Sequence, residues 1–189
     1  MKATKAITGI MAAAMSAAVM ATSLTAFADN ENYINWTGKS ANVHYSVELN
    51  ALKQSNPSDT SMAADALDDS NSYIYYDSTA QNYKLCIAFV PMDAANYGFS
   101  NKTVYVDGMT ATDADGNTLD VAFDSTNSVA VVTINTDSNL YNMSSYDGSE
   151  YAILANFSTD SEDWFLSHII LPMMSPTAYV TFSIGDAIS

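Results

Sequence analysis

The 189-residue chain carries 21 acidic residues and only six basic ones, all lysines, so its net charge is −15 at neutral pH. Nucleic-acid binding requires a basic surface, so this charge balance excludes it. Binding to anionic lipids or phosphorylated substrates also depends on basic side chains and is therefore disfavoured. Strong acidity favours solubility and is compatible with cations.

The first 28 residues are predicted to be a signal peptide that is cleaved on export. Lys2 and Lys5 precede an alanine-rich apolar run, which closes on Ala-Phe-Ala at positions 26–28, and this pattern is typical of exported proteins. The mature chain would start at Asp29 and keep four lysines against 21 acids, a net charge of −17. No second long apolar run follows, so we expect no membrane span after cleavage. The predicted location is extracellular, secreted or associated with the cell surface.

Residues 29–40 are predicted to be an N-terminal lead-in, and residues 41–185 a single domain of short strands. Residues 43–49 alternate between apolar and polar side chains, with His44 on the polar face, as a half-buried strand does. Residues 62–67 follow helix-starting residues and form the one plausible helical turn of the mature chain. Further strands are predicted at 72–76, 83–90, 103–106, 118–123, 129–134, 151–157, 166–171 and 178–184.

Short strands separated by polar turns predict an antiparallel sandwich or barrel, and we choose the sandwich. The segments between the strands are rich in Asp, Asn, Ser and Gly, as turns are. Residues 135–148 form a longer polar loop, which could cover the mouth of a pocket.

Residues suited to catalysis are scarce, so we predict that the protein is not an enzyme. No serine lies in a Gly-x-Ser-x-Gly elbow, and the chain has two histidines and no arginine. Glu150, Glu162 and Asp163 are candidate glycosidase carboxylates by residue type alone, and they lie in polar loops where solvated charge is usual. Cys86 is the only cysteine and lies in an apolar strand, which indicates a buried structural thiol.

Two other patterns point weakly to ligands. Residues 113–117 resemble the start of a calcium loop, but Gly116 comes one position early, so a hairpin turn is the simpler interpretation. The twelve tyrosines permit stacking on sugars. Tyr73, Tyr75 and Tyr76 are the tightest group, although adjacent strand residues point to opposite faces.

The corner between the last two predicted strands holds two methionines. Prolines at 172 and 176 cannot donate to a sheet ladder, so they confine Met173, Met174 and Ser175 to a turn or sheet edge. Ser61 and Met62 open the helical turn, and a short helix over one end of a final hairpin makes a cleft. These methionines either fill the core or line a slot for a flat apolar ligand, such as a metalloporphyrin with thioether ligation.

The order of these motifs resembles the NEAT (near-iron-transporter) domain of Gram-positive surface and secreted proteins, in a clostridia-like variant. The resemblance covers residues 41–184 and rests on the strand at 43–49, SMAADAL at 61–67, IAFVPM at 87–92, ILPMM at 170–174 and AYVTFSI at 178–184. It implies an immunoglobulin-like antiparallel β-sandwich with one short helix. It also implies haem binding between that helix and the last hairpin, for iron acquisition at the cell surface.

The resemblance also implies roles for individual residues. Ser61 and Met62 would form the lip of the haem pocket. The final hairpin of the family carries two tyrosines four residues apart, of which the first ligates the haem iron and the second hydrogen-bonds to the first. Tyr179 matches the second tyrosine, and Ser175 stands where the first is found.

A serine hydroxyl is a poor iron ligand, so two outcomes follow. Haem is held by methionine, with Met174 or its neighbour Met173, and Met62, as iron ligands; or haem binding is lost, and the scaffold binds a protein or another small molecule. We therefore expect an exported NEAT-like module that binds haem or another flat apolar molecule, with host or surface proteins as further partners. The alternatives are a non-haem protein-interaction or adhesion module, and a carbohydrate-binding module.

Overall fold

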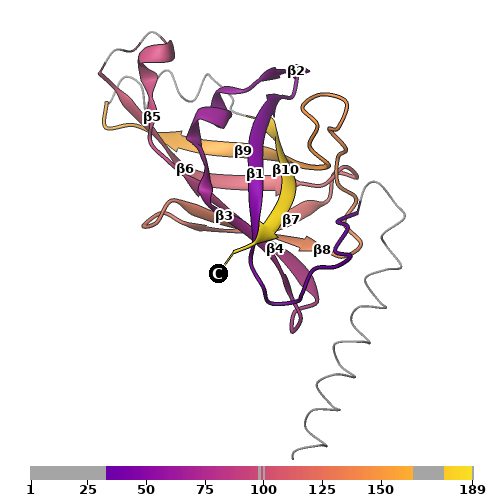
Figure 1. The fold of residues 1–189 in the computed structure, drawn as a ribbon. Coiled ribbons are helices and arrows are strands. Elements are labelled where there is room, and N and C mark those ends of the chain that lie inside the picture. The colour runs from indigo at the N-terminus through magenta and orange to yellow at the C-terminus, as the bar shows by residue number, and fades with distance from the viewer. Residues whose placement is uncertain (1–32, 98, 100, 164–176, 189) are drawn as a thin grey trace, which may run out of the picture.

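The computed structural model describes residues 33–97, 99, 101–163 and 177–188, which form an antiparallel all-β domain (Figure 1). This confirms the all-β prediction. The predicted strand at 166–171 lies outside the described residues. The strands are β1 (Tyr45–Lys53), β2 (Asn56–Thr60), β3 (Leu67–Asp77), β4 (Asn82–Phe89), β5 (Met92–Asp93), β6 (Thr103–Thr112), β7 (Thr118–Asp124), β8 (Val129–Asn135), β9 (Tyr151–Asp160) and β10 (Thr177–Ala187).

Eight of the described strands pair into a closed ring, in the order β1-β10-β9-β6-β7-β8-β4-β3 and back to β1. Two junctions in this ring are short. The β1–β3 junction consists of the pairs Tyr45–Ile74 and Ser46–Tyr73, and the β6–β7 junction also has only two pairs. For description we divide the ring at these two junctions into two groups of four strands, which we call layer A (β3-β4-β8-β7) and layer B (β1-β10-β9-β6).

The interior of the ring is filled by alternate side chains of both layers. Ile74 and Leu85 of layer A and Ile153 and Phe182 of layer B are fully buried in one core. Burial of a side chain of this size stabilises the fold by about 1.5–3 kcal/mol. The alternation therefore divides each strand into an inner face, which packs in the core, and an outer face available to ligands.

The segment predicted to be only a lead-in belongs to this core. Trp36 is 2% exposed, and its ring centroid lies 5.2 Å from that of Tyr45 in β1 and 5.3 Å from that of Tyr83 in β4. The backbone N–H of Asn35 donates a hydrogen bond to the Tyr151 hydroxyl of β9, at 2.9 Å. Residues 33–40 thus contact both layers.

The predicted helical turn is present as the 3₁₀ helix η2 (Met62–Ala66). Ser61 caps it, because its hydroxyl accepts a hydrogen bond from the Ala63 N–H at 3.3 Å. The Ser61 N–H donates to the Ala51 carbonyl of β1 at 2.7 Å, which fixes the start of the helix beside that strand. Ala63 and Ala66 are buried in the core.

The expectation of a single helical turn was wrong, because the described residues include a second 3₁₀ helix, η3 (Ala94–Tyr97). The carboxylate of Asp93 accepts a hydrogen bond from the Ala95 N–H at 2.8 Å and so starts this helix. An aspartate before two alanines is the signal that could have identified it.

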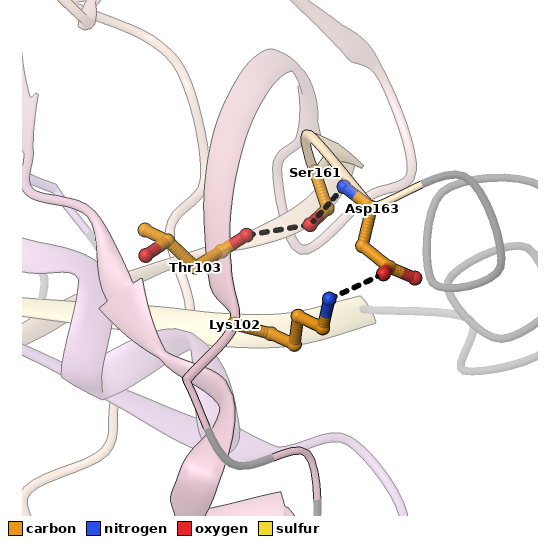
Figure 2. Close-up of polar contacts among 4 residues, drawn as sticks. All are labelled: Lys102, Thr103, Ser161 and Asp163. Carbon is orange, nitrogen blue, oxygen red and sulfur yellow. Dashed lines mark hydrogen bonds and ion pairs between the residues drawn. The ribbon is translucent and has the colours of Figure 1, made fainter.

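An ion pair and two hydrogen bonds, drawn in Figure 2, connect the residues at the end of β9 with those at the start of β6. Lys102 Nζ lies 2.6 Å from the Asp163 carboxylate, and the Ser161 hydroxyl donates to the Thr103 carbonyl at 2.6 Å. The Asp163 N–H in turn donates to the Ser161 hydroxyl at 3.3 Å. Asp163, a candidate carboxylate by residue type, therefore has an ion-pair partner and a structural role here.

Candidate functional site

The candidate site lies where β1 and β10 pair next to η2. Leu52 of β1 stands opposite Tyr179 of β10 on one side and opposite Thr60, the last residue of β2, on the other. Thr60 leads directly into Ser61 and Met62. Neighbouring strands are about 4.8 Å apart, so Thr60 and Tyr179 are separated by about 10 Å. The structure thus places two parts of the predicted site on either side of one strand.

Leu52 and Tyr179 lie on the outer face of layer B. Their chain neighbours Ala51 and Val180 are buried in the main core, and alternation turns the other pair outward. There Leu52 is buried in a second, smaller apolar cluster with Met143 and Ala152, against which half-buried Tyr141 and Tyr179 pack. We call these five residues the outer cluster.

The polar loop between β8 and β9 supplies the covering residues of the outer cluster. Tyr141 exchanges two backbone hydrogen bonds with Ala152, at 3.0 and 2.8 Å. Further along the loop, the Asp147 carboxylate accepts hydrogen bonds from the Thr181 hydroxyl at 2.7 Å and from the Asn50 side chain at 3.3 Å. The loop predicted at 135–148 therefore packs on β1, β9 and β10.

The ring of Tyr141 occupies one side of Tyr179. The two ring centroids are 4.9 Å apart with an interplanar angle of 63°, an edge-to-face arrangement. Burial, followed by electrostatic interaction with Tyr179 and Asp113, raises the pKa of Tyr141. Sequence reasoning missed Tyr141 and Leu52 as neighbours of Tyr179, because that contact depends on the path of the loop.

Of the other residues predicted for the haem site, two belong to the described part of the chain and three do not. Met62 and Ser61 are half-buried at the start of η2. Met173, Met174 and Ser175 lie outside the described residues.

The segment 113–117 is a hairpin turn between β6 and β7, as predicted. Thr112 pairs with Thr118, and the carboxylate of Asp113, which is 2% exposed, accepts hydrogen bonds from the N–H groups of Asp115 and Asn117 at 3.0 and 2.8 Å. Among the described residues, no group of three or more His, Cys, Asp and Glu side chains is arranged to hold a metal ion.

A group of three rings lies on the outer face of layer A, and we call it the aromatic cluster. His44 stacks on Tyr73 with ring centroids 4.3 Å apart, and Tyr75 lies 5.1 Å from His44. Tyr76, which the sequence grouped with these tyrosines, is buried in the core. His44 is exposed, as predicted, but its place beside Tyr73 follows from the β1–β3 pairing, which no local pattern indicates.

Cys86 is buried beneath this cluster, as predicted. It stands opposite Tyr73 in the β3–β4 ladder. The neighbouring Cys86, followed by burial, raises the pKa of Tyr73 to about 12. Burial raises the pKa of the Cys86 thiol, so the reactive thiolate is scarce at neutral pH.

We expect iodoacetamide at pH 8 to label Cys86 at least about tenfold more slowly in the folded protein than in urea, because only local opening exposes the thiol. Tyr73→Ala removes the covering ring and should accelerate labelling of the folded protein, whereas Tyr73→Phe keeps the ring and should leave labelling slow. Mass spectrometry of the labelled protein measures both rates. Equal rates in folded and unfolded protein would contradict the burial of Cys86.

The chain matches no protein-family model and no curated protein sequence. In the part of the chain that the structure describes, every helix is too short or too polar to cross a membrane. A functional assignment therefore depends on the residues of the site and on the resemblance of its motifs.

Proposed function

We propose that the protein is an exported, NEAT-like binding module that takes up haem for iron acquisition at the cell surface. The supporting observation is that Leu52 pairs with Tyr179 on one side and, on the other, with Thr60, the residue before the Ser61–Met62 turn. The tyrosine and the turn are two elements that the resemblance assigns to the haem pocket. A strand that separates them by about 10 Å gives a spacing on the scale of a porphyrin ring.

The outer cluster determines where haem fits best. Tyr141 occupies one side of Tyr179, and Leu52 is buried in the outer cluster, so we place the porphyrin beside the cluster, between Tyr179 and η2. The half-buried ring of Tyr179 would contact the porphyrin, and the thioether of Met62 would approach it from the helix. Met62 and Met174 are the proposed iron ligands. Of these two, Met62 belongs to the described residues.

The finer fold assignment belongs to the same proposal. We propose that the two layers form an immunoglobulin-like sandwich. This assignment is supported by the two junctions of only two residue pairs each, which leave most of each layer free to pack face to face.

Haem titration of the chain without residues 1–28, followed by the Soret band, tests the proposed function. We expect a saturable shift with one haem per protein. Met62→Leu and Met174→Leu keep the side-chain volume but remove the thioether, and each should weaken binding at least about tenfold, or 1.4 kcal/mol.

Tyrosine variants provide a matched control for the same titration. Tyr179→Phe removes only the hydroxyl and should also weaken binding, whereas Tyr105→Phe changes an exposed tyrosine on β6 and should leave binding unchanged. A spectrum that stays that of free haem at micromolar protein would contradict the haem assignment. It would leave the protein-interaction or adhesion module as the better interpretation of the same domain.

A further inference from the structure

The aromatic cluster forms an exposed surface that the proposed haem site does not use. His44 is exposed, and Tyr73 and Tyr75 are half-buried with ring centroids 6.3 Å apart and planes inclined by 29°. Tyr73 and Tyr75 belong to β3, and His44 directly precedes β1, the strand that pairs with β3. The rings lie on the outer surface near the start of β1, where it pairs with β3, whereas the haem site lies near the end of β1.

Two rows of residues extend from this cluster across layer A, and residues paired in register share a face. The row from Tyr73 is apolar and the row from Tyr75 is polar. The first continues through Cys86, Val131 and Ala122, and the second through Lys84, Thr133 and Asp120.

The polar row carries every kind of hydrogen-bonding group that a sugar hydroxyl can use. Lys84 Nζ lies 2.8 Å from the Thr133 hydroxyl, and Asp120 is exposed at the end of the row. An ammonium group donates, a carboxylate accepts and a hydroxyl does both. Aromatic rings next to such groups offer an apolar surface for the C–H face of a pyranose and polar partners for its rim.

We propose that the aromatic cluster and the polar row bind a neutral glycan. The charge balance disfavours acidic glycans, because the mature chain would carry four lysines against 21 acids. A protein partner is the less favoured occupant, because the polar row interrupts the apolar surface that such an interface requires at its centre.

An array of immobilised neutral and sialylated or sulfated oligosaccharides tests this proposal with the chain lacking residues 1–28. We expect binding to neutral glycans and none to the acidic ones. His44→Ala and Tyr75→Ala should each reduce binding at least tenfold. Tyr73 is unsuitable for this test, because it stands opposite the buried Cys86 in the β3–β4 ladder.

Two controls accompany the glycan array. Tyr105→Ala removes an exposed tyrosine of layer B and should retain binding, and His44→Ala changes an exposed side chain, so its thermal unfolding should match that of the parent protein. No binding to any neutral glycan, preference for acidic glycans, or binding that both His44→Ala and Tyr75→Ala leave intact would overturn the proposal. The haem titration of Tyr75→Ala should be unchanged, so failure of one site is distinguishable from failure of the other.

Discussion

Trp36→Ala is expected to lower the free energy of unfolding by about 3–5 kcal/mol. The indole is 2% exposed and packs between Tyr45 and Tyr83, so its removal leaves a cavity where the two layers meet. Urea denaturation followed by circular dichroism measures the loss.

Trp36→Phe is the matched control for this prediction. The buried indole N–H of Trp36 has no hydrogen-bond partner among the described residues, so phenylalanine keeps an aromatic ring and removes a donor that is unpaired there. We expect a change of less than about 1.5 kcal/mol. A loss below about 1 kcal/mol for Trp36→Ala would mean that residues 33–40 are not part of the cooperative fold.

Asp113→Ala is expected to destabilise the protein by about 2–3 kcal/mol. The Asp113 carboxylate is nearly inaccessible to water, and its removal leaves the N–H groups of Asp115 and Asn117 without their acceptor. Thermal and urea unfolding both report the change.

Asp124→Ala is a matched control, because the same arrangement recurs in the next hairpin. Asp124 accepts hydrogen bonds from the N–H groups of Thr126 and Asn127, but it is exposed, so water can replace the lost acceptor. We expect a much smaller loss of stability than for Asp113→Ala. Equal losses would show that burial of Asp113 does not decide the cost.

Local patterns predicted most of the strands and the helical turn, because alternation and capping are properties of neighbouring residues. Strand β8 alternates over its whole length, and its predicted range of 129–134 differs by one residue from Val129–Asn135. Strand β6 was predicted only to residue 106, because Gly108 and an irregularity between Val106 and Gly108 interrupt the alternation. Strand β2 was missed, because its residues are polar and mostly exposed.

Closure of the ring could not be predicted, because it depends on pairings between residues far apart in sequence. Strand β1 pairs with both β3 and β10, and no local pattern specifies two partners for one strand. The burial of Ile34 and Trp36 depends on the same closure, since they pack where the layers meet.

The candidate site was predictable only in those parts that depend on neighbouring residues in the sequence. Ser61 was recognised as a helix start from its own neighbours, and Tyr179 as part of a closing strand. The pairing of Leu52 with Tyr179 and with Thr60, which precedes Ser61, depends on the β1–β10 and β1–β2 registers. The contact between Tyr141 and Tyr179 depends on the path of the β8–β9 loop.

The most direct test of the haem site is nuclear magnetic resonance of the ¹⁵N-labelled chain during addition of zinc protoporphyrin, a diamagnetic haem analogue. We predict that the largest amide shifts will lie at Leu52, Met62 and Tyr179, and that the aromatic cluster around His44 will be unaffected. Shifts confined to residues away from β1, β10 and η2, or no shifts at all, would contradict the assignment of haem to this face.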